Sequence, residues 1–157
     1  MPGRAVEVGL ISDTHGLLRP QAIDALAGCD YIVHAGDICE ARILDELARI
    51  APVTAVRGNN DRGAWAQQVP ATAVLDAGGV LIHVLHDIGE LALDPAAAGF
   101  GVVVTGHSHK PSRELRDGVL YINPGSAGPR RFTLPIALAR LTIVGKRVIA
   151  RLIELEV

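Results

Sequence analysis

The sequence lacks three features that would each point to a particular class of protein. It has no run of about 18 apolar residues, the length that a transmembrane helix needs. The first apolar run, residues 5–11, is short and contains Glu7, which does not fit a signal peptide. There is no basic block, and a formal net charge of −2 argues against a surface that binds nucleic acid. We therefore expect a protein that binds neither membranes nor nucleic acid.

Cysteine is also scarce. Cys29 and Cys39 are the only two, too few for a disulfide framework, and isolated thiols are typical of a reducing compartment. This favours a cytoplasmic protein. With 157 residues, of which 49% are hydrophobic, the chain has the length and the apolar content for one core. We expect a single domain that spans residues 1–157.

The first sixty residues alternate between strand and helix signals. Apolar runs of strand length occupy residues 5–11, 31–35 and 52–56. Helical spacing of apolar residues occupies 20–28 and 40–50, with a proline at the start of the first helix and a glycine at its end. This βαβαβ order predicts a parallel sheet with right-handed crossovers.

After residue 70 the pattern changes to β-structure. Hairpins are predicted at 72–86, 112–123 and 136–155, and a short buried strand at 102–106. This half of the chain is predicted to be a β-meander. We expect two packed sheets with helices outside them, an α/β fold.

Five polar clusters each follow a predicted strand. They are Asp13-Thr14-His15, Gly36-Asp37, Gly58-Asn59-Asn60-Asp61, Leu85-His86-Asp87 and Gly106-His107-Ser108-His109. In parallel α/β sheets, ligand sites gather beyond the carboxyl ends of strands, so these clusters are expected to meet. Mixed imidazole and carboxylate ligands suit Zn, Mn, Fe, Ni or Co and argue against Ca or an iron–sulfur cluster.

Each cluster taken alone also has a simpler interpretation. Asp, Asn and Gly are the residues of tight turns, so Gly58-Asn59-Asn60-Asp61 could be only a turn. Asp13-Thr14-His15 could be turn chemistry after a strand in the same way. The argument for a site depends on the coincidence of metal-ligating residue types at every strand end.

The ordered set of clusters resembles the calcineurin-like metallophosphoesterases, whose motif order is D-x-H, G-D, G-N-x-D, H and G-H-x-H. The stretch Asn123-Pro124-Gly125-Ser126 is similar to the small bacterial and archaeal branch of that family. The resemblance covers roughly residues 6 to 150. It implies a four-layer α/β/β/α sandwich with a dinuclear metal centre at the strand ends.

The resemblance also assigns the ligands. It implies that one ion is held by Asp13, His15, Asp37 and His109. It implies that the second is held by Asp37, Asn59, His86 and His107. Asp37 would then bridge the ions, and Asp61 would orient its neighbours. Two divalent ions are expected, with Mn favoured and Ni, Zn, Fe or Co as alternatives.

The implied activity is hydrolysis of a small phosphodiester by a hydroxide that bridges the two metals. One alternative is a phosphomonoesterase. Another is a non-catalytic scaffold of the same fold, for which the metallophosphoesterase-like subunit of retromer is the precedent. The resemblance also implies a homodimer or homotetramer.

Two positions depart from the family pattern. Many relatives have a histidine at the position of Asn60, and a neutral amide cannot deliver a proton to a leaving group. His34 is the first substitute acid to test, although a structural histidine in a strand is the simpler interpretation. Close relatives read His-Gly-His where this chain has His86-Asp87. Asp87 is expected to cap a turn or helix, with a carboxylate beside the metals as the alternative.

Four arginines are predicted to contact phosphate, because a guanidinium suits this bidentate role. They are Arg57, Arg62, Arg130 and Arg131. The alternative is a solvated charge on a loop. His83 lies three residues before His86 and is expected to face the other side of its strand. Cys39 is expected to be a small buried apolar residue and not a ligand.

Overall fold

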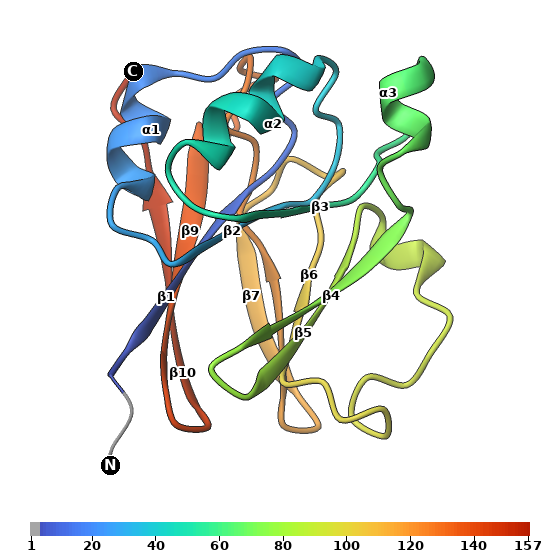
Figure 1. Ribbon diagram of the computed structural model, residues 1–157, viewed down its shortest axis with the longest axis vertical. Helices are drawn as coiled ribbons and strands as arrows, with labels where there is room; N and C mark the ends of the chain where they lie inside the picture. Colours follow the sequence, from blue (N-terminus) through green and yellow to red (C-terminus); the bar gives the residue numbers. More distant parts are fainter. Residues whose placement is uncertain (1–3) are drawn as a thin grey trace.

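The computed structural model describes residues 4–157. Its elements follow one another along the chain as shown in Figure 1. They are β1 (Val6–Ile11), α1 (Pro20–Leu26), β2 (Tyr31–His34), α2 (Ala41–Ala48), β3 (Val53–Ala55), α3 (Ala64–Gln67), β4 (Thr72–Ala77), β5 (Val80–Leu85), η1 (Ile88–Glu90), β6 (Val102–Val104), β7 (Ser112–Arg116), β8 (Val119–Asn123), β9 (Ala137–Val144) and β10 (Arg147–Glu154). Every strand and helix predicted above is present. The short helices α3 and η1 were not predicted.

The first sheet contains the predicted βαβαβ unit. Its strand order is β10-β9-β1-β2-β3, and β1, β2 and β3 are parallel. The hairpin of β9 and β10 adds to the other side of β1, with β9 antiparallel to it. The N-terminal half therefore forms the sheet that its sequence predicts, and the C-terminal hairpin completes it.

The second sheet differs from the prediction. Its order is β4-β5-β6-β8-β7, and β5, β6 and β8 are parallel to one another. Only the hairpin partners β4 and β7 run antiparallel to their neighbours. The prediction of a meander was wrong, because the segment 86–101 crosses over between β5 and β6 and restores the strand direction. Short apolar strands give no local signal for the orientation of their partners.

The two sheets pack face to face, and their inner faces form the main core. Val8, Leu10, Ile82, Val104 and Leu141 are fully buried there. A second core lies between the first sheet and helices α1 and α2, around Leu26, Ile43 and Leu47. The layers follow the predicted α/β/β/α order, but η1 and a turn around 95–98 are the only helical or turn segments over the second sheet in the described residues.

This topology brings six strand ends together. Strands β1, β2 and β3 of one sheet and β5, β6 and β8 of the other each end in a loop at the upper part of the molecule in Figure 1. The five polar clusters lie on five of these loops, and Asn123 to Ser126 follow the sixth. None of the helices in residues 4–157 has the length and apolar character required to cross a membrane.

The core makes a simple prediction about stability. Leu141 on β9 is fully buried between the sheets, whereas Leu115 on the edge strand β7 is 73% exposed. Leu141→Ala should lower the free energy of unfolding by about 2–5 kcal/mol, because it removes buried contacts and leaves a cavity. Leu115→Ala should change it by about 0.5 kcal/mol or less. Urea denaturation of both variants checks this, and equal losses would contradict the assigned core.

Candidate metal centre

Asp13 is the best-defined carboxylate of the site. It follows β1 and is fully buried. Its Oδ2 atom accepts hydrogen bonds from the Ser12 hydroxyl at 2.6 Å and from the main-chain amide of His107 at 3.1 Å. Its Oδ1 atom is buried and has no hydrogen-bond partner among the described residues. A buried carboxylate oxygen without a partner is costly unless a cation faces it.

Imidazole nitrogens surround that unpartnered oxygen. His109 Nε2 lies 3.4 Å from Asp13 Oδ1, and His15 Nε2 lies 3.9 Å from it. The Nε2 atoms of His15 and His109 are themselves 3.4 Å apart. Two ring nitrogens and a carboxylate oxygen that point at one position form the donor set of a first-row divalent metal. Asp13, His15 and His109 therefore fit one ion.

A second group of donors lies next to the first. Asp37 Oδ2 is 3.4 Å from His86 Nε2 and 3.7 Å from His15 Nε2, so it lies between the two groups. The side-chain oxygen of Asn59 is 3.0 Å from His86 Nε2 and 3.2 Å from His107 Nδ1. Asp37, Asn59, His86 and His107 therefore fit a second ion. The structure brings all seven predicted ligands to one place.

A hydrogen bond at the far nitrogen of its ring aims the His86 side chain. His86 Nδ1 donates to the carbonyl oxygen of Ala35 at 2.7 Å, which leaves Nε2 directed at Asp37. Burial alone would lower the pKa of His86, but the hydrogen bonds to Asp37 and Ala35 raise it to about 9. Burial would raise the pKa of Asp37, but His86 and the Asn60 amide hold it well below its usual range. The carboxylate is thus kept ionised inside the protein.

Backbone strain is concentrated at the same residues. Asp13, His15, Asp37, His107 and His109 all have positive φ, between 46° and 71°. This conformation is uncommon for residues other than glycine, and it persists only where the surrounding structure enforces it. The strand ends therefore turn sharply so that both members of a motif point inward.

Two glycines and one aspartate make these turns fit together. A Cβ atom at Gly58 would overlap Asp37, and one at Gly106 would overlap Ser12. Asp61 accepts hydrogen bonds from the amides of Gly58, at 2.8 Å, Asp37, at 3.0 Å, and Cys39, at 2.7 Å. Asp61 therefore holds the Asp37 loop in place, which is the orienting role that the sequence predicted for it.

Comparison with known proteins agrees with this geometry. Residues 6–146 match the family described as the calcineurin-like phosphoesterase superfamily domain. The chain belongs to this superfamily. A probable metallophosphoesterase of Methanothermobacter thermautotrophicus is 35% identical, over 94% of this chain and 91% of its own length. A phosphodiesterase of Methanocaldococcus jannaschii is 26% identical, over 76% of this chain and 83% of its own length.

Solved structures show the same fold. Vacuolar Protein Sorting 29 from Cryptosporidium parvum superposes with a TM-score of 0.82, at 22% identity, over 97% of this chain and 92% of that one. The superfamily fold and the two-sheet α/β class predicted from sequence are thus confirmed. This likeness to Vacuolar Protein Sorting 29 concerns the fold alone.

Asn60 lies in the loop after β3, next to the proposed ligand Asn59. It is exposed, and its main-chain amide donates to Asp37 Oδ1 at 2.9 Å. Its side-chain amide donates to Asp37 Oδ2 at 3.0 Å, the oxygen that lies between the two donor groups. Asn60 therefore lies at the open side of the centre and supports the carboxylate that is expected to bridge the ions.

His34 does not have the geometry of a substitute acid. It is fully buried on β2; its Nδ1 accepts from the amide of Gly36 at 3.1 Å, and its Nε2 lies 3.0 Å from the Thr14 hydroxyl. Burial lowers its pKa to about 4. A neutral ring that uses both nitrogens inside the protein ties the loops after β1 and β2 together and cannot reach a substrate. The simpler structural interpretation is the one that this geometry supports.

The side chain of Asp87 caps the short helix η1. Its Oδ1 accepts from the amide of Gly89 at 2.9 Å, as the favoured interpretation predicted. Its Oδ2 also lies 4.0 Å from His107 Nε2, on the far side of that ring from Asn59. The two interpretations of Asp87 therefore both hold, because one carboxylate oxygen caps η1 and the other lies near the proposed ligand His107.

His83 and Cys39 lie outside the donor groups. His83 is buried on the outer face of β5 and contacts Phe100, with ring centroids 5.0 Å apart, which agrees with its predicted structural role. Cys39 is only half-buried, and its Sγ lies 3.6 Å from His15 Nδ1, on the side of the ring away from Asp13. Cys39 thus supports His15 instead of filling a core.

The four arginines predicted to bind phosphate behave differently. Arg57 donates to the carbonyl oxygens of Ala66 and Val69, and Arg130 donates to that of Leu134. Arg62 is exposed and makes no hydrogen bond or ion pair within residues 4–157. Arg131 is exposed and close enough to His15 for its charge to act on that ring. Burial, more than Arg131, lowers the pKa of His15. Arg131 is the arginine best placed to meet an anion at the centre.

Sequence reasoning missed three residues that support the ligands. The Ser12 hydroxyl donates to the carboxylate of Asp13, and the Ser126 hydroxyl donates to its main-chain carbonyl oxygen. Asn123 donates to the carbonyl oxygen of Gly106 at 2.9 Å and so fixes the loop that carries His107 and His109. Their position directly after strands was the available signal, but serine and asparagine are common there for turn chemistry alone.

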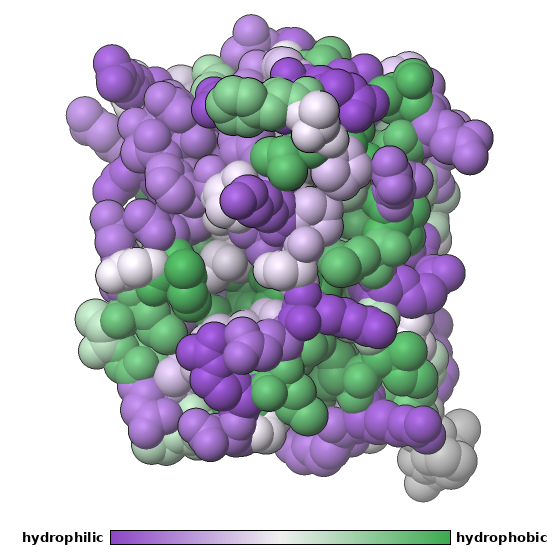
Figure 2. Space-filling model, turned by 180° about the vertical axis from the view of Figure 1, so that it is seen from behind, coloured by the Kyte–Doolittle hydropathy of each residue, from purple (hydrophilic) through white to green (hydrophobic). Residues whose placement is uncertain are grey.

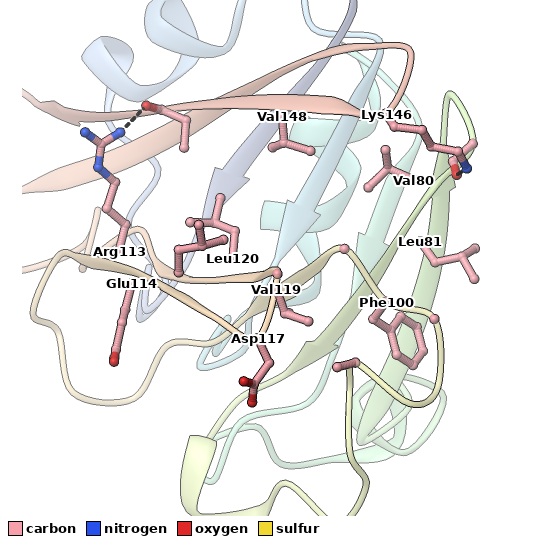
Figure 3. A pocket seen from close by; sticks show the side chains of 17 residues that line it. Val80, Leu81, Phe100, Arg113, Glu114, Asp117, Val119, Leu120, Lys146 and Val148 are labelled. Atoms are coloured by element: carbon pink, nitrogen blue, oxygen red, sulfur yellow. Dashed lines mark hydrogen bonds between the residues drawn. The ribbon is translucent and has the colours of Figure 1, made fainter.

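A cavity lies away from the metal centre. Its volume is about 690 Å³, and it opens between the β5 region, the β7–β8 hairpin and β10. Figure 3 shows Val80, Leu120 and Val148 around it, with Arg113 bonded across to the main chain of β10. Seen from behind in Figure 2, apolar side chains surround a hollow near the middle of the molecule. None of the seven donor residues lines this cavity.

The buried His34 makes a prediction about pH. Its pKa is about 4 in the folded protein and about 6.5 in the unfolded chain, so the unfolded state binds the proton more readily. The part of the free energy of unfolding that depends on His34 is therefore at its maximum above pH 6.5, and it is lost as the pH falls toward 4. Between pH 7 and pH 5, the wild type should lose about 2 kcal/mol more than His34→Asn. Urea denaturation with chelator checks this, and parallel losses would contradict it.

Proposed function

We propose that this chain is a dinuclear metal-dependent phosphodiesterase. The observation that carries the proposal is the buried, unpartnered Oδ1 of Asp13, which faces the Nε2 atoms of His15 and His109. This carboxylate has a complete donor set around it, and its Oδ1 atom has no hydrogen-bond partner in residues 4–157. The superfamily membership and the phosphodiesterase relative from Methanocaldococcus jannaschii support the same activity.

The charge of the centre suits a phosphodiester. Two divalent ions and the carboxylates of Asp13 and Asp37 sum to about +2, which attracts a monoanionic phosphodiester despite the net charge of −2 on the chain. When bound, the ions lower the pKa of coordinated water and stabilise charge on the phosphoryl oxygens. The mixture of imidazole, carboxylate and amide donors supports manganese as the native ion, with nickel, zinc, iron or cobalt as alternatives.

The protein side chains hold and orient the reacting groups. Asp37 is kept ionised by His86 and the Asn60 amide, so it is ready to bind cations without losing a proton first. Arg131, which is exposed and close enough to His15 for its charge to act on that ring, would attract the negative charge of the phosphate. Asn59, Asn60 and His107 are exposed and line the approach of the substrate. The free thiols of Cys29 and Cys39 support a reducing compartment such as the cytoplasm.

A metal-by-substrate assay tests the proposal. Metal-stripped protein is supplied with Mn, Ni, Zn, Co or Mg and with p-nitrophenyl phosphate or bis(p-nitrophenyl) phosphate. We expect metal-dependent turnover that favours the diester, and two ions per chain by elemental analysis. Asp37→Asn should lower the metal content and reduce kcat by about 100-fold or more, because the shared ligand is lost.

Three other results would each change the assignment. Faster turnover of the monoester would favour a phosphomonoesterase. Metal binding without turnover of any ester would favour a non-catalytic scaffold. Full metal content and activity in Asp37→Asn would contradict the assigned ligands, whichever reaction the protein catalyses.

Asn60 makes a separate prediction about the leaving group. An amide cannot donate a proton to a departing alkoxide, so the rate should depend steeply on the pKa of the leaving group. Asn60→His should make this dependence shallower and raise the rate on alkyl esters by about 10- to 100-fold, with a smaller effect on aryl esters. Rates on a series of substituted phenyl and alkyl diesters measure the slope.

Asn60→Ala is the control for this experiment. It also loses the hydrogen bond to Asp37 Oδ2, but it supplies no acid. An equal change of slope in both variants would assign the effect to Asp37. A shallow slope in the wild type would show that an efficient acid exists elsewhere.

A further inference from the structure

A groove adjoins the metal centre on the outer face of the second sheet. Its volume is about 470 Å³, and His107 and Asp87 form its end nearest the metal centre. Its floor is formed by residues of β7 and β8 and of the loop after β6, among them Thr105 and Tyr121, and Ile88 of η1 forms one side. The groove exists because no α-helix in residues 4–157 covers this part of the sheet. A substrate bound at His107 can therefore extend directly into it.

The groove offers free hydroxyl groups. Thr105, Ser112 and Tyr121 all line it, and their hydroxyls make no hydrogen bond within residues 4–157. Ser112 pairs with Asn123, and Glu114 with Tyr121, so these side chains lie on the same face of the sheet. Hydroxyls act as both donors and acceptors, so they suit a ligand that carries hydroxyls of its own.

Both arginines that line the groove are engaged by other groups of the protein. The guanidinium of Arg116 is paired with both carboxylate oxygens of Glu114, at 2.8 and 3.3 Å, and lies 4.7 Å from the centre of the Tyr121 ring. Arg113 donates to the carbonyl oxygen of Ala150 in the first sheet, at 2.6 Å, which directs its guanidinium away from the groove. Asp87 adds a negative charge at the metal end. A second phosphate in this groove would have to compete with Glu114 for Arg116, and the carboxylate of Asp87 would repel it.

We infer that this groove binds one ester group of the phosphodiester substrate, and that it selects an uncharged, hydroxyl-bearing group of sugar or nucleoside size. An ester group with a further phosphate is rejected. The volume is in the usual range for a site that holds a small organic group, about 300–1,000 Å³. The inference rests on the proposed phosphodiesterase function, and it names the class of substrate.

Three p-nitrophenyl esters test the inference, because they share one leaving group and differ only in the other ester group. They are methyl p-nitrophenyl phosphate, the p-nitrophenyl ester of thymidine 5′-phosphate, and the same thymidine ester with a 3′-phosphate. The methyl group is too small to enter the groove and reports on the metal centre alone. We expect the wild type to prefer the uncharged thymidine ester over both others by about 10-fold in kcat/KM.

Two variants change the groove without touching the proposed ligands. Ser112→Trp fills it and should lower kcat/KM for the uncharged thymidine ester by at least about 10-fold, while the methyl ester changes by less than about twofold. Glu114→Gln frees Arg116, and should shift the ratio of the two thymidine esters by about fivefold or more toward the phosphorylated one. Asp45→Asn on α2, an exposed loss of one negative charge outside the groove, is the matched control and should not shift the ratio.

The outcomes separate this inference from the proposed function. Turnover of the methyl ester with no effect of either groove variant on the thymidine esters would overturn the inference and leave the phosphodiesterase intact. No turnover of any ester with any metal would overturn the phosphodiesterase itself. Calorimetry of the manganese-loaded protein with thymidine 5′-phosphate and thymidine 3′,5′-bisphosphate gives a second readout. Tighter binding of the bisphosphate to the wild type than to Glu114→Gln would also overturn the inference.

Discussion

Two carboxylates buried at the strand ends determine the rest of this structure. Taking an ionised group out of water costs several kcal/mol in a real protein unless charge or hydrogen bonds compensate for it. Asp37 receives that compensation from His86 and Asn60, and Asp13 receives it on only one of its two oxygens. The Oδ1 atom of Asp13 is therefore left without a hydrogen-bond partner in residues 4–157. A divalent cation held by Asp13 and the neighbouring histidines would satisfy this oxygen.

The topology of the two sheets brings the buried carboxylates and the histidines together. Parallel strands from two sheets end at one edge, so ligands far apart in sequence converge without any long loop. Each strand then turns within two or three residues of its end, and positive φ at Asp13, Asp37 and His107 is the cost of turning so early. Asp61 and the buried His34 offset that cost, because each accepts a hydrogen bond from a main-chain amide of these turns. The strained turns and the side chains that stabilise them therefore belong to the same group of loops.

The sequence predicts features that depend on neighbouring residues better than features that depend on contacts between distant parts of the chain. Strands, helices and hairpin turns were predicted correctly, because apolar period and turn residues are local. The parallel pairing of β5, β6 and β8 was not, since it depends on a crossover whose path has no periodicity. The ligands were predicted through the order of their motifs. Ser12 and Asn123 were missed, because their contribution consists of single hydrogen bonds to groups that only the fold brings near.

The sparse covering on the outer face of the second sheet links the fold to the inferred selectivity for one ester group of the substrate. η1 has only three residues, and the face beside His107 is open to a ligand. One carboxylate oxygen of Asp87 caps η1, and the other lies 4.0 Å from His107 Nε2. Asp87 therefore places a negative charge at the end of the groove nearest the metal centre. Under the proposed function, the metal centre would attract one phosphate, and the groove would make neutral contacts with the ester group attached to it. His107 would then belong both to the site of the reaction and to the site that selects the substrate.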